Sequence, residues 1–141
     1  MKVFITGVAG FLGSHLAEHC LNKGFKVVGN DTLIGGDLSN LQGLDIEFYK
    51  VDCSDLEEMT KIMKGSDVLC HSAAFAHEGL STVSPKLICE NNVVGSTSVF
   101  TAAIKNDLKR IVYCSSMARY GNAKIPYLEN LEPKPVDPYG V

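Results

Sequence analysis

The chain has 141 residues, a length typical of one domain, and 45% of these residues are hydrophobic while 21% are charged. This composition excludes an intrinsically disordered chain, which combines low hydrophobicity with high net charge. Thirteen basic and sixteen acidic residues give a net charge of −3, so the chain has no basic field with which to bind nucleic acid or an anionic membrane.

Short runs of β-branched and aromatic residues alternate with longer amphipathic stretches. The runs predict strands at residues 3–5, 25–28, 46–49, 68–70 and 111–114. Helical spacing of apolar residues predicts helices at 12–20, 56–63 and 87–104. This alternation is typical of an α/β fold, and we expect a doubly wound, three-layer parallel sheet of the Rossmann type with strand order 3-2-1-4-5.

Two stretches lack such patterns. Residues 35–43 form a polar connection between the second and third predicted strands. Residues 125–138 contain four prolines, which exclude a helix or an internal strand. Because a loop of this length normally leads into further structure, we expect residues 1–141 to be a fragment of a longer protein, truncated after about five strands.

Gly7, Gly10 and Gly13 form the pattern G-x-x-G-x-x-G between the first predicted strand and the first predicted helix. A dinucleotide pyrophosphate needs close backbone and the free N–H groups of a helix start. Asp31 closes the second predicted strand, 18 residues after Gly13, where a carboxylate accepts hydrogen bonds from a ribose 2′-hydroxyl and repels a 2′-phosphate. The unit therefore predicts NAD rather than NADP, with Phe11 and Leu12 as further cofactor-binding residues.

The sequence also contains partial motifs of two other enzyme classes. His15, Glu18 and His19 spell H-x-x-E-H, an inverted zinc-hydrolase motif. A zinc site also needs a third protein ligand, and a polar outer helix face explains the same residues, so we expect no metal. Ser116 lacks the G-x-S-x-G surroundings of a hydrolase nucleophile. His71, at the end of the fourth predicted strand, is expected to satisfy a buried hydrogen bond.

In these residues the chain resembles the extended short-chain dehydrogenase/reductases, and among them the NAD-dependent epimerase/dehydratases that include the UDP-glucose 4-epimerases. The resemblance covers the whole chain and rests on seven motifs in order. They are Thr6-Gly7-x-x-Gly10-x-x-Gly13-Ser14-His15, Asp31, Val51-Asp52, His71-Ser72-Ala73-Ala74, Asn92-Val93-Val94-Gly95-Ser96, Ser115-Ser116-Met117-Ala118-Arg119-Tyr120-Gly121 and Pro138-Tyr139-Gly140.

The resemblance implies a cofactor site built from several strand ends. Asp52 and Cys53 would border the adenine, and Ala73 and Ala74 would line the cofactor after the fourth strand. Asn92, or its neighbour Asn91, would reach the cofactor from the long helix.

The resemblance also implies a catalytic pair, Ser116 and Tyr139. In this family the tyrosine acts as a base on a sugar hydroxyl while hydride passes to NAD, and the serine hydrogen-bonds the same oxygen. The family pattern Tyr-x-x-x-Lys places a lysine four residues after Tyr139, beyond the end of this sequence. We therefore expect this fragment to be inactive alone, without the substrate domain that follows in the family.

The expected activity of the parent protein is NAD-dependent epimerisation of a nucleotide sugar through a 4-keto intermediate. Met117 and Ala118 occupy the positions where dehydratases of the family carry an Asp-Glu pair, which disfavours dehydration. Arg119 and Ala76 depart from the epimerase pattern, and another nucleotide-sugar oxidoreductase or dehydratase, or a non-catalytic NAD-binding module, stays open.

The five cysteines are an odd number without a C-x-x-C pair, which favours reduced thiols and a cytoplasmic protein. No apolar run reaches the ~18 residues of a membrane span. We expect a nucleotide-sugar substrate, neither nucleic acid nor membrane as a partner, and, by the resemblance, a homodimer of the full-length protein.

Overall fold

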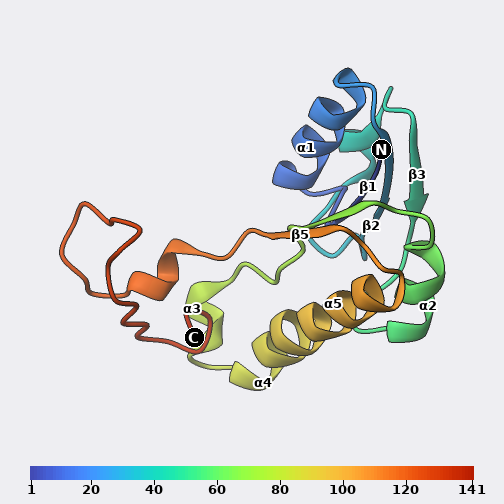
Figure 1. The fold of residues 1–141 in the computed structure, drawn as a ribbon. Coiled ribbons are helices and arrows are strands. Elements are labelled where there is room, and N and C mark those ends of the chain that lie inside the picture. Colours follow the sequence, from blue (N-terminus) through green and yellow to red (C-terminus); the bar gives the residue numbers. More distant parts are fainter.

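A computed structural model describes all residues, 1–141, and contains one parallel five-stranded sheet in the order β3-β2-β1-β4-β5 (Figure 1). This confirms the predicted fold class and strand order. The strands are β1 (Lys2–Thr6), β2 (Lys26–Asn30), β3 (Ile46–Tyr49), β4 (Val68–His71) and β5 (Arg110–Tyr113).

The central strand β1 is buried on both faces, which explains its nearly continuous apolar run. Ile5 pairs with Gly29 of β2 on one side and with Cys70 of β4 on the other. A Cβ on Gly29 would lie 2.6 Å from the Ile5 carbonyl oxygen, so glycine at this position allows the chain to pass close to β1.

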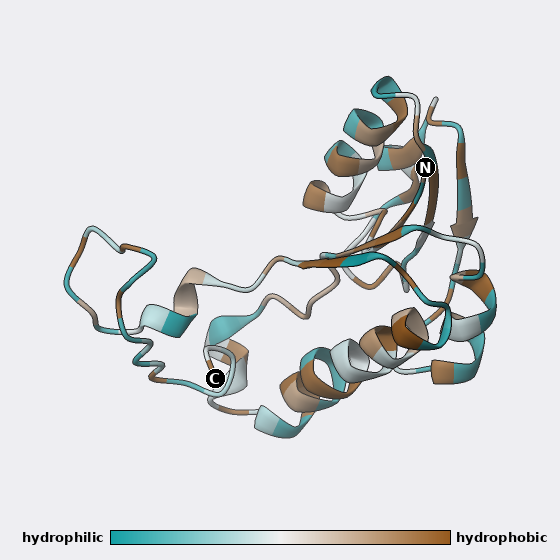
Figure 2. Ribbon diagram, in the orientation of Figure 1, coloured by the Kyte–Doolittle hydropathy of each residue, from teal (hydrophilic) through white to brown (hydrophobic).

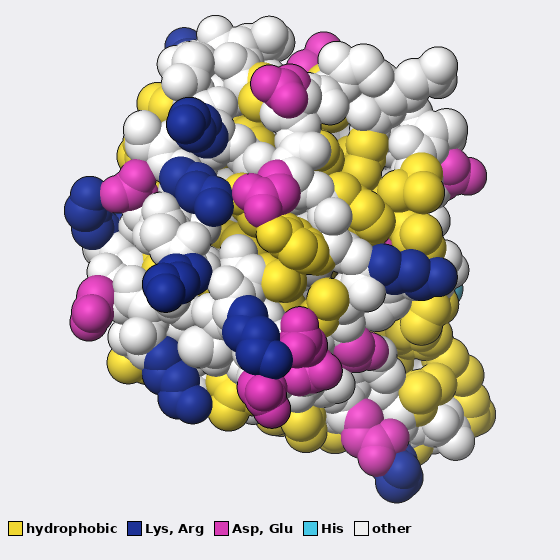
Figure 3. All heavy atoms as spheres, turned by 90° about the vertical axis from the view of Figure 1, so that its right-hand side faces the viewer, with side chains coloured by type: hydrophobic (Ala, Val, Ile, Leu, Met, Phe, Trp, Pro, Cys, Tyr) yellow, Lys and Arg dark blue, Asp and Glu magenta, His cyan; other side chains and the backbone are white.

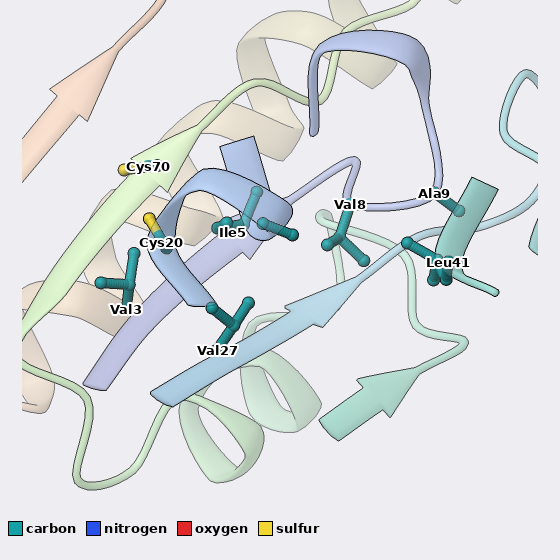
Figure 4. Close-up of a cluster of buried hydrophobic side chains, with 9 residues drawn as sticks. Val3, Ile5, Val8, Ala9, Cys20, Val27, Leu41 and Cys70 are labelled. Atoms are coloured by element: carbon teal, nitrogen blue, oxygen red, sulfur yellow. The ribbon is translucent and has the colours of Figure 1, made fainter. Parts of the chain in front are cut away.

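Helices cover both faces of the sheet (Figure 1). On one face, α1 (Phe11–Asn22) contributes Ala17 and Cys20 to a cluster with Val3 and Ile5, drawn in Figure 4. On the other face, α2 (Leu56–Ile62) and α5 (Gly95–Lys105) pack against Phe4 and its neighbours. Alternate residues of β1 thus serve opposite cores, as the pleat of a strand requires.

The third predicted helix, at 87–104, is a helical run over residues 85–105 with a wider turn inside it. The run consists of α4 (Pro85–Ile88), a π-helical turn η2 (Cys89–Val94) and α5. Pro85 stands at the first position of α4, where its missing N–H has no intrahelical partner to lose. A π turn holds more residues than an α turn, so it changes which side chains share a face.

Three short elements lie in connections for which the sequence predicted no structure. They are α3 (Glu78–Ser81) and the 3₁₀ turns η1 (Leu38–Leu41) and η3 (Met117–Tyr120). In η1 the Asp37 carboxylate accepts from the Ser39 N–H, and Leu41 is buried in the core beside α1.

The chain after β5 leaves the sheet and returns so that the C-terminus lies beside α3 (Figure 1). Residues 125–138 form neither helix nor strand, as the four prolines predict.

Most residues of the strands are hydrophobic, whereas the helices carry both hydrophobic and polar residues (Figure 2). On the face in Figure 3, acidic and basic side chains are mixed. None of the helices has the length and hydropathy needed to cross a membrane.

Candidate functional site

The carboxyl ends of β1, β2 and β4 border a cleft of about 370 Å³. Eight of the predicted cofactor-binding residues line this cleft: Gly7, Gly10, Phe11, Asp31, Asp52, Cys53, Ala73 and Ala74. Leu12, Gly13, Asn92, Ser116 and Tyr139 are not among its lining residues. Asn30 and Ile34, for which the sequence predicted no role, also line it, and so does His77, which follows the fourth strand.

The glycine turn fits tightly between the sheet and the start of α1. Gly7 has φ +66°, and a Cβ there would lie 2.9 Å from the Ala73 Cα. A Cβ on Gly13 would overlap the Gly7 carbonyl oxygen. The first N–H groups of α1 have no intrahelical acceptor, and no side chain caps this end of the helix. The turn therefore offers free backbone donors beside a surface without side chains, as a phosphate group requires.

Asp31 is held in place by backbone donors at the end of β2. Its Oδ2 accepts from the Ala9 N–H at 3.0 Å, and its Oδ1 accepts from the Leu33 N–H at 2.8 Å. The residue is 8% exposed. Because each carboxylate oxygen can accept about two hydrogen bonds, both retain capacity for hydroxyl groups in the cleft.

The turn after β3 is tied to β2 by Asn30. The Asn30 side chain donates from Nδ2 to the Val51 carbonyl oxygen at 2.9 Å and to Cys53 Sγ at 3.5 Å. Burial raises the pKa of the Cys53 thiol to about 11, with smaller increases from the charges of Asp52 and Asp31, so the thiol is protonated at neutral pH.

A buried network connects the glycine turn to α5 behind the cleft. Thr6 Oγ1 accepts from the N–H groups of Ser72 and Ala73, both at 3.1 Å, and therefore uses its own proton to donate to His71 Nδ1 at 2.7 Å. His71 Nε2 then donates to Ser96 Oγ at 2.8 Å. Burial lowers the pKa of His71 to about 4, so the ring is neutral. The expectation that His71 satisfies a buried hydrogen bond is confirmed.

The π turn η2 gives its two asparagines different surroundings. Asn92 Oδ1 accepts from the Phe75 N–H at 2.7 Å, and Asn92 Nδ2 donates to the Phe75 carbonyl oxygen at 3.4 Å. Asn92 thereby fixes the segment after β4. Asn91 lines the cleft, and its Nδ2 donates to the Leu87 carbonyl oxygen at 2.9 Å.

Ser116 and Tyr139 lie on two turns that contact each other. The Ser116 side chain caps η3 by accepting from the Ala118 N–H at 3.1 Å. Tyr139 lies in a turn closed by the Asp137 carboxylate, which accepts from the Gly140 N–H at 2.8 Å. A Cβ on Gly140 would lie 2.8 Å from the Ala118 carbonyl oxygen, so the two turns are in backbone contact.

The H-x-x-E-H pattern lies on the exposed side of α1. His15 Nδ1 is 2.7 Å from the Phe11 carbonyl oxygen of the same helix. No group of three or more His, Cys, Asp or Glu side chains in residues 1–141 is placed to hold a metal ion.

Comparisons with known proteins identify the family of this chain. The sequence model of the NAD dependent epimerase/dehydratase family matches residues 3–141. The UDP-glucose 4-epimerase of Streptomyces lividans is 33% identical over 143 aligned positions, which cover 99% of this chain and 43% of that enzyme. The crystal structure of UDP-glucose 4-epimerase from Thermotoga maritima with UDP-glucose superposes with a TM-score of 0.93 at 32% identity, over 99% of this chain and 47% of the other. That from Brucella ovis in complex with NAD superposes with a TM-score of 0.92 at 30% identity, over 99% and 43%. The chain thus spans less than half the length of these relatives.

Proposed function

Because the chain belongs to the NAD-dependent epimerase/dehydratase family, we propose that residues 1–141 form a Rossmann domain that holds NAD in the cleft. We propose further that the whole protein epimerises a nucleotide sugar at C4, the reaction named for the UDP-glucose 4-epimerases it resembles. The observation that carries the proposal is the tight glycine turn against Ala73, with the Asp31 carboxylate fixed beside it.

The residues present fit NAD along the length of the cleft. Gly7 and Gly10 leave room for a pyrophosphate at the free N–H groups of α1, and Phe11, Leu12 and Gly13 supply those groups. Asp31 accepts from the hydroxyls of the adenosine ribose, and its charge disfavours a 2′-phosphate. Asp52 and Cys53 border the adenine, whereas Ala73, Ala74 and the neighbouring Asn92 support the opposite end.

The proposed chemistry places two hydroxyl side chains on the sugar. NAD supplies a hydride acceptor when it is bound. Tyr139 would accept the proton of the C4 hydroxyl, and Ser116 would hydrogen-bond the same oxygen as it becomes a carbonyl. Tyr139 would then return this proton to the oxygen when the ketone is reduced on its other face, which inverts the carbon. The backbone contact between the two turns supports this assignment.

The setting proposed for the whole protein is the cytoplasm. All five cysteines are free thiols, as expected of a reducing compartment. The homodimer implied by the family resemblance stays a prediction.

The proposal is tested by isothermal titration of this chain with NAD and NADP at fixed salt. We expect NAD to bind at least about tenfold tighter than NADP, because the Asp31 carboxylate repels the extra phosphate. Asp31→Ala should weaken NAD binding by about 10- to 100-fold, the range for hydrogen bonds to a charged group.

Asp45→Ala is the matched control, since Asp45 is exposed and forms no salt bridge. It should leave both affinities unchanged. Absence of NAD binding, or equal binding of NADP, contradicts the cofactor assignment. If NAD binds but the full-length protein with Tyr139→Phe keeps its epimerase activity, the catalytic assignment is wrong while the cofactor assignment stands.

A further inference from the structure

The side chains that line the cleft include acidic groups but no lysine or arginine. Asp31 and Asp52 contribute two carboxyl groups. A dinucleotide adds a diphosphate with two further negative charges. His77 is the only lining side chain that can become a cation. A bound diphosphate therefore has one candidate for a cationic partner among these side chains.

The imidazole of His77 is fixed by packing, yet its nitrogens are free. The ring stands edge-on to the Phe75 ring, with 4.8 Å between the ring centroids and 67° between the planes. The His77 N–H donates to the Phe75 carbonyl oxygen at 2.9 Å, and the Asn92 side chain holds the same backbone. His15 and His71 use ring nitrogens in hydrogen bonds to the protein, whereas those of His77 have no partner.

His77 ends a segment that begins in contact with the glycine turn. A Cβ on Gly7 would lie 2.9 Å from the Ala73 Cα, so the turn and the start of this segment touch. Residues 73–77 all line the cleft, as do Gly7 and Gly10 of the turn. The free N–H groups at the start of α1 and the free imidazole of His77 therefore belong to two walls of one cleft.

We propose that His77 binds the diphosphate of the dinucleotide: its protonated imidazole donates a hydrogen bond to a phosphate oxygen, while the glycine turn donates from the other wall. The inference rests on the proposed function, because it takes NAD as the molecule in the cleft. A charge-assisted bond needs the protonated ring. The affinity for NAD should therefore increase as the pH falls through the range in which histidine gains its proton.

The other charged groups near His77 do not produce this pH dependence. Those of the cleft wall, of α3, α4 and η2, and of the turn that contacts α3 are Asp31, Asp52, Glu78, Lys86, Glu90 and Asp137. Carboxyl and ammonium groups as classes keep their charge between about pH 6 and pH 8. Burial keeps the Cys53 thiol protonated, with a pKa of about 11, and the His71 ring neutral, with a pKa of about 4.

The test is isothermal titration of this chain with NAD at pH 6 and at pH 8, at fixed salt. The unmodified chain should bind NAD about threefold to tenfold tighter at pH 6, the range for a partly exposed hydrogen bond that gains a charge. His77→Ala should bind NAD with equal affinity at both pH values. His77→Lys carries its charge throughout this range, so it should bind NAD at pH 8 as tightly as the unmodified chain does at pH 6.

His19→Ala is the matched control, because His19 is an exposed histidine of α1 that does not line the cleft. It should keep the affinity and the pH dependence of the unmodified chain. ADP-ribose, which has the diphosphate but lacks the nicotinamide, identifies the part of the ligand that His77 contacts. His77→Ala should weaken ADP-ribose and NAD by the same factor at pH 6. Because the His77 side chain forms no capping bond to α3, its variants should retain the fold, which circular dichroism checks at each pH.

Three results would overturn the inference. A pH dependence that persists in His77→Ala would assign it to another group. Weakened NAD binding with unchanged ADP-ribose binding would place His77 at the nicotinamide instead of the diphosphate. Equal affinities of the unmodified chain at pH 6 and pH 8 would mean that no cationic imidazole contacts the ligand. Failure of the unmodified chain to bind NAD at either pH would refute the proposed function itself, which is a different observation from binding that does not depend on His77.

Discussion

At the scale of single residues, the glycines of the turn have a role opposite to their usual effect in a helix. Alanine is normally the better helix former by about 1 kcal/mol. Gly13 lies inside α1, yet a Cβ there would overlap the Gly7 carbonyl oxygen and come within 2.8 Å of the Val8 Cα. Backbone contact between the helix and the turn therefore decides the identity of this residue.

Gly13→Ala should consequently destabilise the chain by about 2 kcal/mol, in the range of overpacked core substitutions, and abolish NAD binding. Gly79→Ala in α3 is the control, because nothing lies within 4 Å of a Cβ at that position. It should change stability by less than about 1 kcal/mol. Urea unfolding of the two variants measures the difference, and equal stabilities would contradict the packing of α1 on the turn.

His71 links stability to pH. The pKa of about 4 in the fold lies below the ordinary 6.5. Between pH 6.5 and pH 4 the unfolded chain binds a proton that the folded chain does not bind. The contribution of His71 to stability is therefore complete above pH 6.5 and decreases as the pH falls. We expect a loss of about 2 kcal/mol in the free energy of unfolding between pH 7 and pH 5.

Urea unfolding at pH 7, 6 and 5 measures this loss. His71→Gln should lower the stability at pH 7, because the bond to Thr6 Oγ1 or to Ser96 Oγ is disturbed, and should reduce the slope with pH. The same slope in the variant and in the unmodified chain would show that other groups cause the acid sensitivity.

At the scale of elements, β3 and β5 are the two edge strands of the sheet, and β5 is the more exposed of the two. Its four residues, Arg110–Tyr113, are all exposed, whereas β1 is buried along Val3–Thr6. Local opening of β5 breaks few apolar contacts, so its free energy should lie well below that of global unfolding.

Hydrogen exchange tests this difference. Amides of β5 should exchange faster than those of β1 by at least about tenfold, because edge strands open without disrupting the core. Met59 and Leu69 lie in the second core cluster, and their amides provide the slowly exchanging reference. Equal protection of β5 and β1 would mean that the edge is covered in solution.

The elements also show what sequence alone can predict. Runs such as Val3-Phe4-Ile5 and the spacing of Gly7, Gly10 and Gly13 are local signals, and the structure has a strand and a tight turn at these places. The π turn η2 escaped prediction because an extra residue per turn leaves the apolar spacing nearly helical. That turn separates Asn91, in the cleft wall, from Asn92, bonded to Phe75.

Other site features depend on residues distant in the sequence. The hydrogen bond from Asn30 Nδ2 to the Val51 carbonyl oxygen forms only when β2 and the turn at Val51 are brought together. Turn η1 is fixed by the burial of Leu41 in the core beside α1 and by the Asn40 side chain, which donates to the Ala9 carbonyl oxygen, so the polar stretch contains a structured turn. The roles of Ser116 and Tyr139 remain predictions from the family resemblance.

At the scale of the whole molecule, the cleft joins the segments that follow β1, β2, β3 and β4 with Asn91 of η2. A ligand that bridges them should stabilise the fold by mass action. NAD at about 100 times its Kd adds about 2.7 kcal/mol, which raises the Tm by roughly 8 °C for a chain of this size. Thermal unfolding with NAD, with NADP and without ligand measures the effect, and equal shifts with the two dinucleotides would contradict selection by Asp31.

The distribution of the five thiols has a practical consequence. Cys20 and Cys70 are buried, and Cys53 is held protonated in the cleft, whereas Cys89 and Cys114 are exposed. The thiolate is the nucleophile that attacks alkylating reagents, so the two exposed sulfurs should be modified first, and storage in air should join molecules through disulfides at these positions. Neither Cys89 nor Cys114 lines the cleft, so a fluorophore attached to either thiol leaves the cleft open. The chain can therefore be labelled for an optical binding assay without a substitution.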